Sequence, residues 1–530
     1  MTFSIETSLN PFWAEGKGFI NGRDPLGIQN SSVSIYAALL PGLNNVTDRL
    51  RYYGFYCWLL KRIDDKKLSF EERQDQYNYI RKAEYMLAVY MSECEPEQQG
   101  IAGSAYAVRK LRESRAAGEN FIDIKNGAEK HSGTEKGSVF WDFKAGILGQ
   151  YYAGSLQDNY AGLGLLRISA GFYFVTEVGK QLGAAYGKTV GSIAEKLFDK
   201  TISTGILQLK DILLLADFSI SNIQLTSDEG KFYTNSLFST DFSLRTDTVL
   251  ETTYRRDSLL LFLDSLADFK DERDFQNLPE LLYQKAGLIG QKSCSDASIG
   301  WFYYYCCERM HISVEFLFYA ILKEIETKRQ TIKAVSDTLT STCLKGFDNC
   351  YTNFPEEMML SELIELVQEE SDVDYVGVMN SKDKGEGLVY AIEYFLLTYK
   401  TVKVHENNFK TFTHTTRTRD KNGTALDWAH YVDKKLSLPI DKFIAELLIK
   451  IMNDHLHVAY SKMGNGDEQV HKFIIEDNNL IHINNIAPRF TTPRLKTVRN
   501  FLQDVGIIKF NEKEGYIITK AGEEILTPYK

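Results

Sequence analysis

The last forty residues of the chain, 491–530, constrain its fold most, because they predict several local elements in a fixed order. Pro493, preceded by threonines that suit a cap, opens a helix. The apolar positions of this helix are Leu495, Val498 and Leu502. The positions that it leaves for solvent are Arg494, Lys496 and Arg499. Gly506 ends the helix, and residues 509–510 and 516–518 form two short strands. Thr519 then caps a closing helix over residues 520–526.

This order of helix, glycine turn, β-hairpin and closing helix resembles a winged helix, a variant of the helix-turn-helix. The resemblance implies binding to DNA or to a partner protein, and it implies no chemistry. A local excess of positive charge suits either DNA or an acidic partner protein. The segment from Arg489 to Lys509 carries five basic residues and one acidic residue, Asp504, a local net charge of +4 in a chain of −10. The five basic residues are candidate contacts: Arg489, Arg494, Lys496, Arg499 and Lys509.

Residues 163–182 repeat the pattern of residues 505–525. Both have a glycine among apolar residues, then a basic residue, an aromatic-led strand, and a threonine three places before a glycine. We therefore expect Tyr173–Val175 and Tyr516–Ile518 to be equivalent wing strands, each followed by a threonine cap. The alternative is that strand–threonine–helix junctions look alike because such caps are common.

Composition limits the possible partners and locations. The net charge of −10 argues against general nucleic-acid binding, so any DNA contact needs a local basic patch. Seven scattered cysteines favour reduced thiols. The N-terminus lacks a signal-peptide pattern, and no apolar run reaches transmembrane length. These features predict a cytoplasmic protein without a membrane partner.

The chain length predicts several domains. The expected fold is mainly α with small β-hairpins, with two winged-helix modules flanking a helical middle. The predicted segments are an N-terminal helical domain (1–95), an inner winged-helix-like domain (96–190), a helical domain (191–330), a helical domain with a basic loop (331–430), and a helix followed by the C-terminal winged helix (431–530). Apolar stretches at residues 257–266, 301–305, 312–325 and 440–451 predict buried cores.

Two further groups of basic residues are candidate contacts. A loop expected over residues 403–421 mixes cations with hydroxyl groups, which suits phosphate. Its candidates are Arg417, Arg419 and Lys421. On a helix expected over residues 47–63, Arg49 and Arg51 lie off the apolar stripe. They predict either an ordinary solvated face or a contact to phosphate or to a carboxylate of a partner.

Several short motifs resemble an uncharacterised bacterial family whose members are often encoded beside anti-phage or anti-plasmid defence genes. The motifs are Asp24-Pro25-Leu26-Gly27, Leu40-Pro41-Gly42, residues 47–53 with Trp58, His455 to Met463, Thr492-Pro493-Arg494 and residues 505–522. The resemblance implies a defence complex and no catalytic residues. Two winged helices around a helical body also resemble the kleisin subunits that bridge the heads of chromosome-maintenance ATPases, in architecture alone.

Patterns typical of catalysis are weak. Residues 183–189 nearly match a phosphate-binding loop but follow a helix, and His455, His457 and His471 suit a helix or surface better than a metal. We therefore expect no cofactor, no metal and no catalytic residue. The predicted function is a non-enzymatic defence subunit, a DNA-sensing or ATPase-bridging adaptor. Its partners would be an ATPase or nuclease encoded nearby, with duplex DNA possible.

Two other functions stay open. One is a nuclease with a cryptic carboxylate site, for example Asp374 with Lys382 and Lys384. The other is a winged-helix transcriptional regulator, which the length and acidic charge disfavour. Metal-dependent cleavage by the pure protein would favour the nuclease.

Overall fold

The computed structural model describes most of the chain. The described residues are 24–157, 162–238, 249–266, 295–351, 354–355, 357–368, 374–381, 383–416, 418, 423–463 and 470–527. In this part helices dominate, and every strand belongs to a two-stranded antiparallel sheet. The predicted fold class, mainly α with small β-hairpins, is confirmed. Among the described residues, no helix combines the length and the apolar character that crossing a membrane requires.

The chain forms two compact units, and each draws on segments far apart in the sequence. The first unit combines Met1–Tyr36 with Pro279–Thr491, and the second combines Ala37–Leu278 with Thr492–Lys530. The five consecutive segments predicted from the sequence are therefore grouped differently. Of the predicted last segment, 431–530, only Thr492–Lys530 joins the unit that contains the internal copy.

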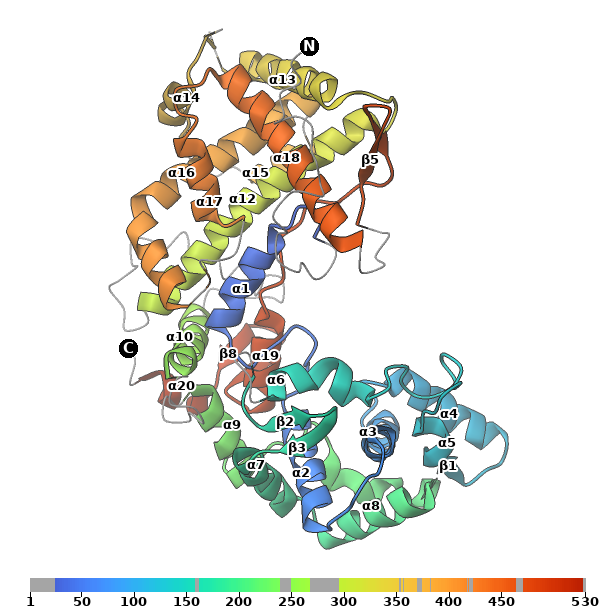
Figure 1. Ribbon diagram of the computed structural model, residues 1–530. Helices are drawn as coiled ribbons and strands as arrows, with labels where there is room; N and C mark the ends of the chain where they lie inside the picture. The colour runs from blue at the N-terminus through green and yellow to red at the C-terminus, as the bar shows by residue number, and fades with distance from the viewer. Residues whose placement is uncertain are drawn as a thin grey trace. The chain divides into compact units, whose positions relative to one another are not determined.

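The first unit is helical apart from one hairpin (Figure 1). Its elements are α1 (Gln29–Leu39, which continues into the second unit), α12 (Ser295–Ile325), α13 (Ile332–Cys350), α14 (Leu360–Leu366), α15 (Tyr375–Ser381), α16 (Lys384–Thr415), α17 (Ala425–Asp433), α18 (Ile440–Met463), β5 (Phe473–Glu476) and β6 (Asn479–His482). Helix α12 runs along α16, and α13 and α18 pack against this pair. The aromatic run Trp301–Tyr305 on α12 is buried, so the prediction that it is core is confirmed.

The second unit contains more and shorter elements. Its helices are α2 (Arg51–Asp65), α3 (Arg73–Cys94), α4 (Ser104–Ala116), α5 (Ile124–Ala128), the π-helix η1 (Leu148–Tyr152), α6 (Ala153–Leu156), α7 (Glu177–Thr189), α8 (Ser192–Thr204), the 3-10 helix η2 (Leu209–Phe218), α9 (Asp228–Phe238), α10 (Val249–Ser265), α19 (Leu495–Asp504) and α20 (Lys520–Leu526). Its strands pair as β1 (Phe121–Asp123) with β4 (Ile206–Gln208), β2 (Leu166–Ser169) with β3 (Phe172–Val175), and β7 (Ile508–Asn511) with β8 (Gly515–Ile518).

Helix α2 is the core of the second unit and is buried on nearly all sides. Helix α7 crosses it closely, because α7 carries glycines at the contact. A Cβ atom added at Gly183 would lie 2.7 Å from the carbonyl oxygen of Cys57. The glycines of the stretch 183–189 therefore allow helices to approach each other, and their resemblance to a phosphate-binding loop has a packing explanation.

The predicted basic loop over residues 403–421 is wrong for its first part, because α16 extends to Thr415. Glu406 pairs with Lys403 and Lys410, one helical turn away on either side. Apolar side chains on the same stretch face the core, namely Val402, Phe409 and Phe412. The helical periodicity of these apolar residues is present in the sequence, but the net charge of the segment does not reveal it. The candidates Arg417, Arg419 and Lys421 lie outside the described residues.

The segment between α4 and α6 also differs from expectation. The polar, glycine-containing residues 114–137 predict a loop, but α5 forms there because the Asp123 side chain accepts a hydrogen bond from the Asn126 amide, 2.9 Å. A helix over residues 138–152 is also predicted, but residues 138–145 form bends and turns, and helical structure begins at Gly146. These bends and turns form a wall that is described below.

Candidate binding site: two hairpin–helix modules

The two copies predicted from the sequence form the same local structure. We name residues 163–189 the inner module and residues 505–526 the C-terminal module. In each, an antiparallel hairpin is followed by a capped helix. The predicted strands Tyr173–Val175 and Tyr516–Ile518 are the second strands of these hairpins.

The predicted threonine caps are confirmed in both modules. The hydroxyl oxygen of Thr176 accepts a hydrogen bond from the Gly179 amide at 3.1 Å, and that of Thr519 accepts one from the Gly522 amide at 3.3 Å. Each cap satisfies an amide that the first turn of a helix leaves without a partner.

The same threonines tie each helix back to the glycine turn before the hairpin. The hydroxyl of Thr176 donates to the carbonyl oxygen of Gly164 at 2.7 Å, and the hydroxyl of Thr519 donates to that of Gly506 at 2.8 Å. Both glycines have φ of 72°, in the left-handed region that favours glycine. One hydroxyl therefore closes both ends of the hairpin.

The glycine three residues after each threonine has a steric role. A Cβ atom at Gly179 would lie 2.0 Å from the carbonyl oxygen of Leu165, and one at Gly522 would lie 2.5 Å from that of Ile507. The first turn of each helix rests directly on the backbone of the turn, which leaves no space for a side chain. This contact explains why threonine and glycine recur at the same spacing.

Two arginines of the C-terminal patch do not face solvent, so this part of the prediction is wrong. Arg494 precedes α19 with φ of 62°, and its guanidinium donates to the carbonyl oxygen of Leu40 at 3.1 Å. Arg499 is only 7% exposed, and its guanidinium carbon lies 5.5 Å from the centre of the Tyr516 ring. Arg494 therefore joins the start of α19 to the segment at Leu40, and Arg499 joins α19 to its own hairpin.

The N-terminal arginines are buried as well, so the solvated helix face is also wrong. Arg49 pairs with Asp504 at 3.0 Å, and Arg51 pairs with Glu229 at 3.2 Å. Burial raises the pKa of Asp504 to about 6, although the Arg49 guanidinium and the Leu50 amide act in the opposite direction. Burying both partners of an ion pair removes them from the surface that a DNA backbone or a partner could reach.

The other three basic candidates are exposed. Lys496 lies 3.7 Å from Asp48, and Lys509 projects from β7. Arg489 is exposed too, but it belongs to the first unit, where its backbone amide donates to Glu315. The net charge of +4 counted along the sequence therefore does not form one surface patch of the second unit.

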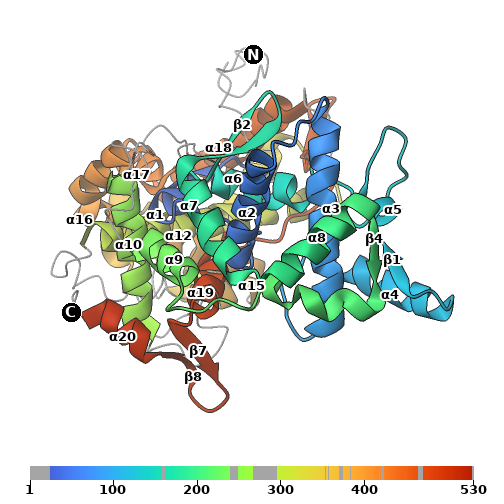
Figure 2. The ribbon, with the colours of Figure 1, turned by 90° about the horizontal axis from the view of Figure 1, so that it is seen from below.

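Both hairpins expose a cation and an aromatic ring. On the inner module Arg167 and Phe174 are cross-strand partners and both are exposed. On the C-terminal module Lys509 and Phe510 are consecutive residues of β7, so their side chains point to opposite faces of the hairpin, and Phe510 is 53% exposed. Figure 2 shows β7 and β8 projecting beyond α19 and α20 of the same unit.

The sites considered for chemistry in the first unit have structural roles. The ring of His455 is buried, with Nδ1 2.9 Å from the carbonyl oxygen of Pro25 and Nε2 accepting from the Lys472 amide at 3.0 Å. Burial lowers the pKa of His455 to about 3, so the prediction of a satisfied histidine is confirmed. Asp374 accepts the Gly377 amide at the start of α15.

Lys384 pairs with Glu324, and Lys382 lies outside the described residues. Within the described ranges, no three His, Cys, Asp or Glu side chains converge as a metal ion would require. Comparisons with family models, with curated proteins and with solved structures find nothing that matches this chain.

Proposed function

We propose that this chain is a non-enzymatic binding subunit that contacts a partner protein through the exposed faces of its two hairpins, β2–β3 and β7–β8. The observation that carries the proposal is that each hairpin exposes one cation and one aromatic ring, Arg167 and Phe174 on the first and Lys509 and Phe510 on the second. Aromatic residues and arginine are enriched at the energetically dominant centres of protein interfaces.

The charges around the C-terminal hairpin favour a protein over duplex DNA. On this hairpin and α20 the exposed acidic residues outnumber the exposed lysines, which are Lys509, Lys513 and Lys520. The acidic residues are Glu512, Glu514, Glu523 and Glu524. A DNA backbone would be repelled by these carboxylates, whereas a protein surface can match both signs. The burial of Arg499 and the engagement of Arg494 with the carbonyl oxygen of Leu40 leave fewer cations free to attract phosphate.

The resemblance noted from the sequence supplies the context. A bacterial defence complex would provide the partner as an ATPase or nuclease subunit encoded nearby, in the cytoplasm. The two hairpins would give an adaptor two equivalent contacts, as bridging requires. An adaptor of this kind needs no catalytic group of its own.

The test is co-purification of the full chain with the tagged products of its neighbouring genes. The double variant Phe174→Ala/Phe510→Ala removes both exposed rings without touching the caps. We expect at least a tenfold loss of the retained partner, because truncating an aromatic at an interface centre typically costs about 2 kcal/mol. Val404→Ala removes an even more exposed apolar side chain from α16 and should leave retention unchanged.

Retention that survives the double variant would contradict the proposal. A second measurement addresses DNA directly, with a fluorescent duplex and the variant Arg167→Glu/Lys509→Glu. If the wild-type chain binds the duplex, and this variant loses the duplex but keeps the partner, DNA binding replaces partner docking as the function of the hairpins.

A further inference from the structure

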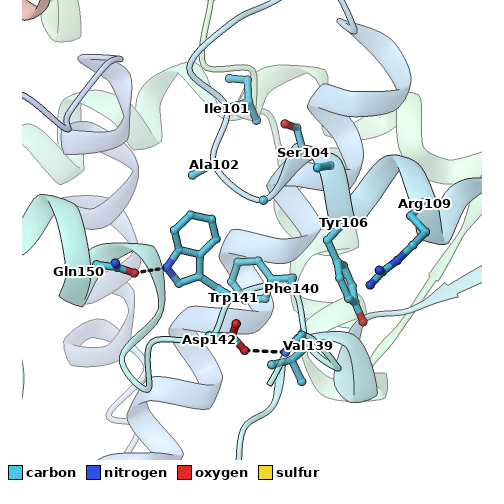
Figure 3. A pocket seen from close by; sticks show the side chains of 13 residues that line it. Ile101, Ala102, Ser104, Tyr106, Arg109, Val139, Phe140, Trp141, Asp142 and Gln150 are labelled. Atoms are coloured by element: carbon cyan, nitrogen blue, oxygen red, sulfur yellow. Dashed lines mark hydrogen bonds between the residues drawn. The ribbon is translucent and has the colours of Figure 1, made fainter. Parts of the chain in front are cut away.

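The second unit contains a hollow of about 710 Å³ that the hairpins do not use. One side is the start of α4 with the residues before it, and the other is the irregular segment 137–142 with the π-helix η1 (Figure 3). Its chemically distinctive side chains are Tyr106, Arg109, Phe140, Trp141, Asp142 and Gln150. A volume of several hundred Å³ is typical of small-molecule sites.

Two aromatic rings form one wall and are held in place. The indole nitrogen of Trp141 donates to the Gln150 side chain at 2.7 Å, as the dashed line in Figure 3 shows. The Phe140 ring stacks on Tyr85 with centroids 5.6 Å apart. Gln150 lies on η1, and single π-helical turns are frequent at functional sites.

A buried arginine fixes the backbone of this wall. Arg81 donates to the carbonyl oxygens of Ala128, Trp141 and Phe143 at 2.6, 2.7 and 2.7 Å. Its guanidinium carbon also lies 5.0 Å from the centre of the Phe140 ring. The wall is therefore ordered before any ligand arrives, which lowers the entropic cost of binding.

A buried carboxylate fixes the entry to the π-helix. Glu84 accepts hydrogen bonds from the backbone amides of Ile147 at 3.0 Å and Leu148 at 2.8 Å. Because Gln150 lies in the turn that these bonds begin, its amide is held against Trp141. The aromatic wall thus rests on two buried charged residues from one helix, α3.

The opposite wall supplies positive charge. The Arg109 guanidinium lies 4.9 Å from the centre of the Tyr106 ring, and its side chain is 54% exposed. Its contact with Glu113 is 3.8 Å long and exposed, so that carboxylate competes weakly with a ligand. The first turn of α4, which has no side-chain cap, lines the same wall and adds amide groups.

The one acidic group of the hollow is engaged elsewhere. The Asp142 carboxylate accepts the Gly137 amide at 2.8 Å. In the view of Figure 3, Asp142 lies on the far side of the Phe140 and Trp141 rings from Ser104. A negative group of a ligand near the start of α4 would therefore meet Arg109 before it meets this carboxylate.

We propose that this hollow binds a planar aromatic ligand that carries one anionic group, phosphate or carboxylate. The ring stacks on Trp141, and the anionic group lies between Arg109 and the start of α4. Stacking on an aromatic side chain and a charge-assisted contact to arginine together select ligands that have both parts. The inference is independent of the proposed hairpin contacts.

The test is calorimetric titration of the full chain with four probes: adenosine monophosphate, indole-3-acetate, adenosine and inorganic phosphate. We expect saturable binding of at least one of the first two, and at least tenfold weaker binding of the last two, each of which has only one part. Adenosine monophosphate and indole-3-acetate also distinguish the two possible anionic groups, because the first carries a phosphate and the second a carboxylate.

Variants locate the site. Arg109→Ala should weaken the bound probe at least fivefold, and Trp141→Ala at least tenfold, while Trp141→Phe should retain part of the affinity. Arg112→Ala removes an exposed arginine from the same helix and outside the hollow, so affinity should not change. Arg109 is exposed, so its variant is expected to fold even if Trp141→Ala does not.

Two results would overturn the proposal. One is the failure of both adenosine monophosphate and indole-3-acetate to bind the wild-type chain at millimolar concentration. The other is binding that Arg109→Ala leaves unchanged, which would place the probe elsewhere.

Discussion

The inner and C-terminal modules share one local design and differ in how the rest of the second unit holds them. The inner hairpin is fastened to α3, where the Gln76 side chain both donates to and accepts from the backbone of Tyr173, at 2.9 Å each. Tyr77 adds a hydrogen bond to the carbonyl oxygen of Gly171 at 2.6 Å. The hairpin is therefore anchored along its second strand.

The C-terminal module is anchored through the helix that precedes it. Asp504 on α19 accepts the Leu50 amide and pairs with Arg49, and Thr497 donates to the carbonyl oxygen of Asn44 at 2.6 Å. Its hairpin extends beyond this anchor and leaves Phe510 half exposed. Two modules with the same local structure can therefore make different contacts with the rest of the unit. Those contacts decide which face of each hairpin remains exposed.

The largest effect expected is a pH dependence from two buried carboxyl groups on the helices that anchor the modules, Glu84 on α3 and Asp504 on α19. Burial raises the pKa of Glu84 to about 7 and that of Asp504 to about 6. Each carboxyl group binds its proton more tightly when folded, so its contribution to the free energy of unfolding is complete below about pH 4 and falls as pH rises to its folded pKa. For Glu84 the loss is on the order of 3 kcal/mol.

Denaturant unfolding at a series of pH values checks this expectation. The deficit of Glu84→Gln relative to the wild type should shrink as pH rises to about 7, and that of Asp504→Asn should stop shrinking near 6. Glu93→Gln alters a carboxylate of α3 that pairs with Arg115 at the surface and serves as the matched control. Deficits of Glu84→Gln that do not vary with pH would show that this carboxyl group titrates normally when folded.

Alanine substitution of the helix glycines should show which module packs its helix more closely against its turn. Gly179→Ala should lower the free energy of unfolding by about 3 kcal/mol and Gly522→Ala by about 2 kcal/mol, because overpacking costs rise with overlap. The added Cβ atoms would lie 2.0 and 2.5 Å from carbonyl oxygens. Gly154→Ala on α6 meets nothing within 4 Å, so it should not lower stability and should raise it by up to about 1 kcal/mol.

Equal and small losses at Gly179 and Gly522 would mean that both helices can move away from their turns. Thermal unfolding of the three variants beside the wild type measures the ranking.

Alanine substitution of two basic residues of α19 should affect stability differently, although the sequence predicts that both are exposed. Arg499→Ala should cost about 2 kcal/mol, because it removes a buried side chain that lies against the Tyr516 ring. Lys496→Ala should cost less than about 0.5 kcal/mol, because its contact with Asp48 is exposed. Denaturant midpoints measure both, and a larger loss at Lys496 would reverse the assignment of inner and outer faces.

The smallest effect tests whether the caps are equivalent. Thr176→Ala and Thr519→Ala should each lower the free energy of unfolding by about 1 kcal/mol, because each removes one cap. The serine variants keep the hydroxyl and should recover most of the loss. Losses that differ by more than about 1 kcal/mol would show that one hydroxyl carries a further interaction.

Local features of both modules could be predicted from the sequence. The turn at Gly506, the caps at Thr176 and Thr519, and the closing helix over residues 520–526 all follow from contacts within a few residues of the chain. Such contacts depend on backbone conformations that a short sequence favours on its own. The buried aromatic run on α12 followed from composition and period in the same way.

The candidate site was less predictable, because burial of a cation depends on distant residues. The helix period correctly placed Leu495, Val498 and Leu502 inward, but it could not place Arg499 beside Tyr516. The continuation of α16 through Lys403 was missed for a different reason. Its apolar period was present in the sequence, and a count of charges concealed it.

The sequence by itself determined the mainly α fold, the repeated hairpin–cap–helix and the buried runs, because hydrogen bonds and side-chain periodicity over a few residues specify them. The tertiary structure alone decided which cations remain at the surface, which segments share a unit, and that α4 and the wall at Trp141 enclose a hollow. Arg49 and Asp504 are 455 positions apart in the chain, and no local pattern marks them as partners. Their pairing depends on the packing of whole helices, which places side chains that the sequence separates.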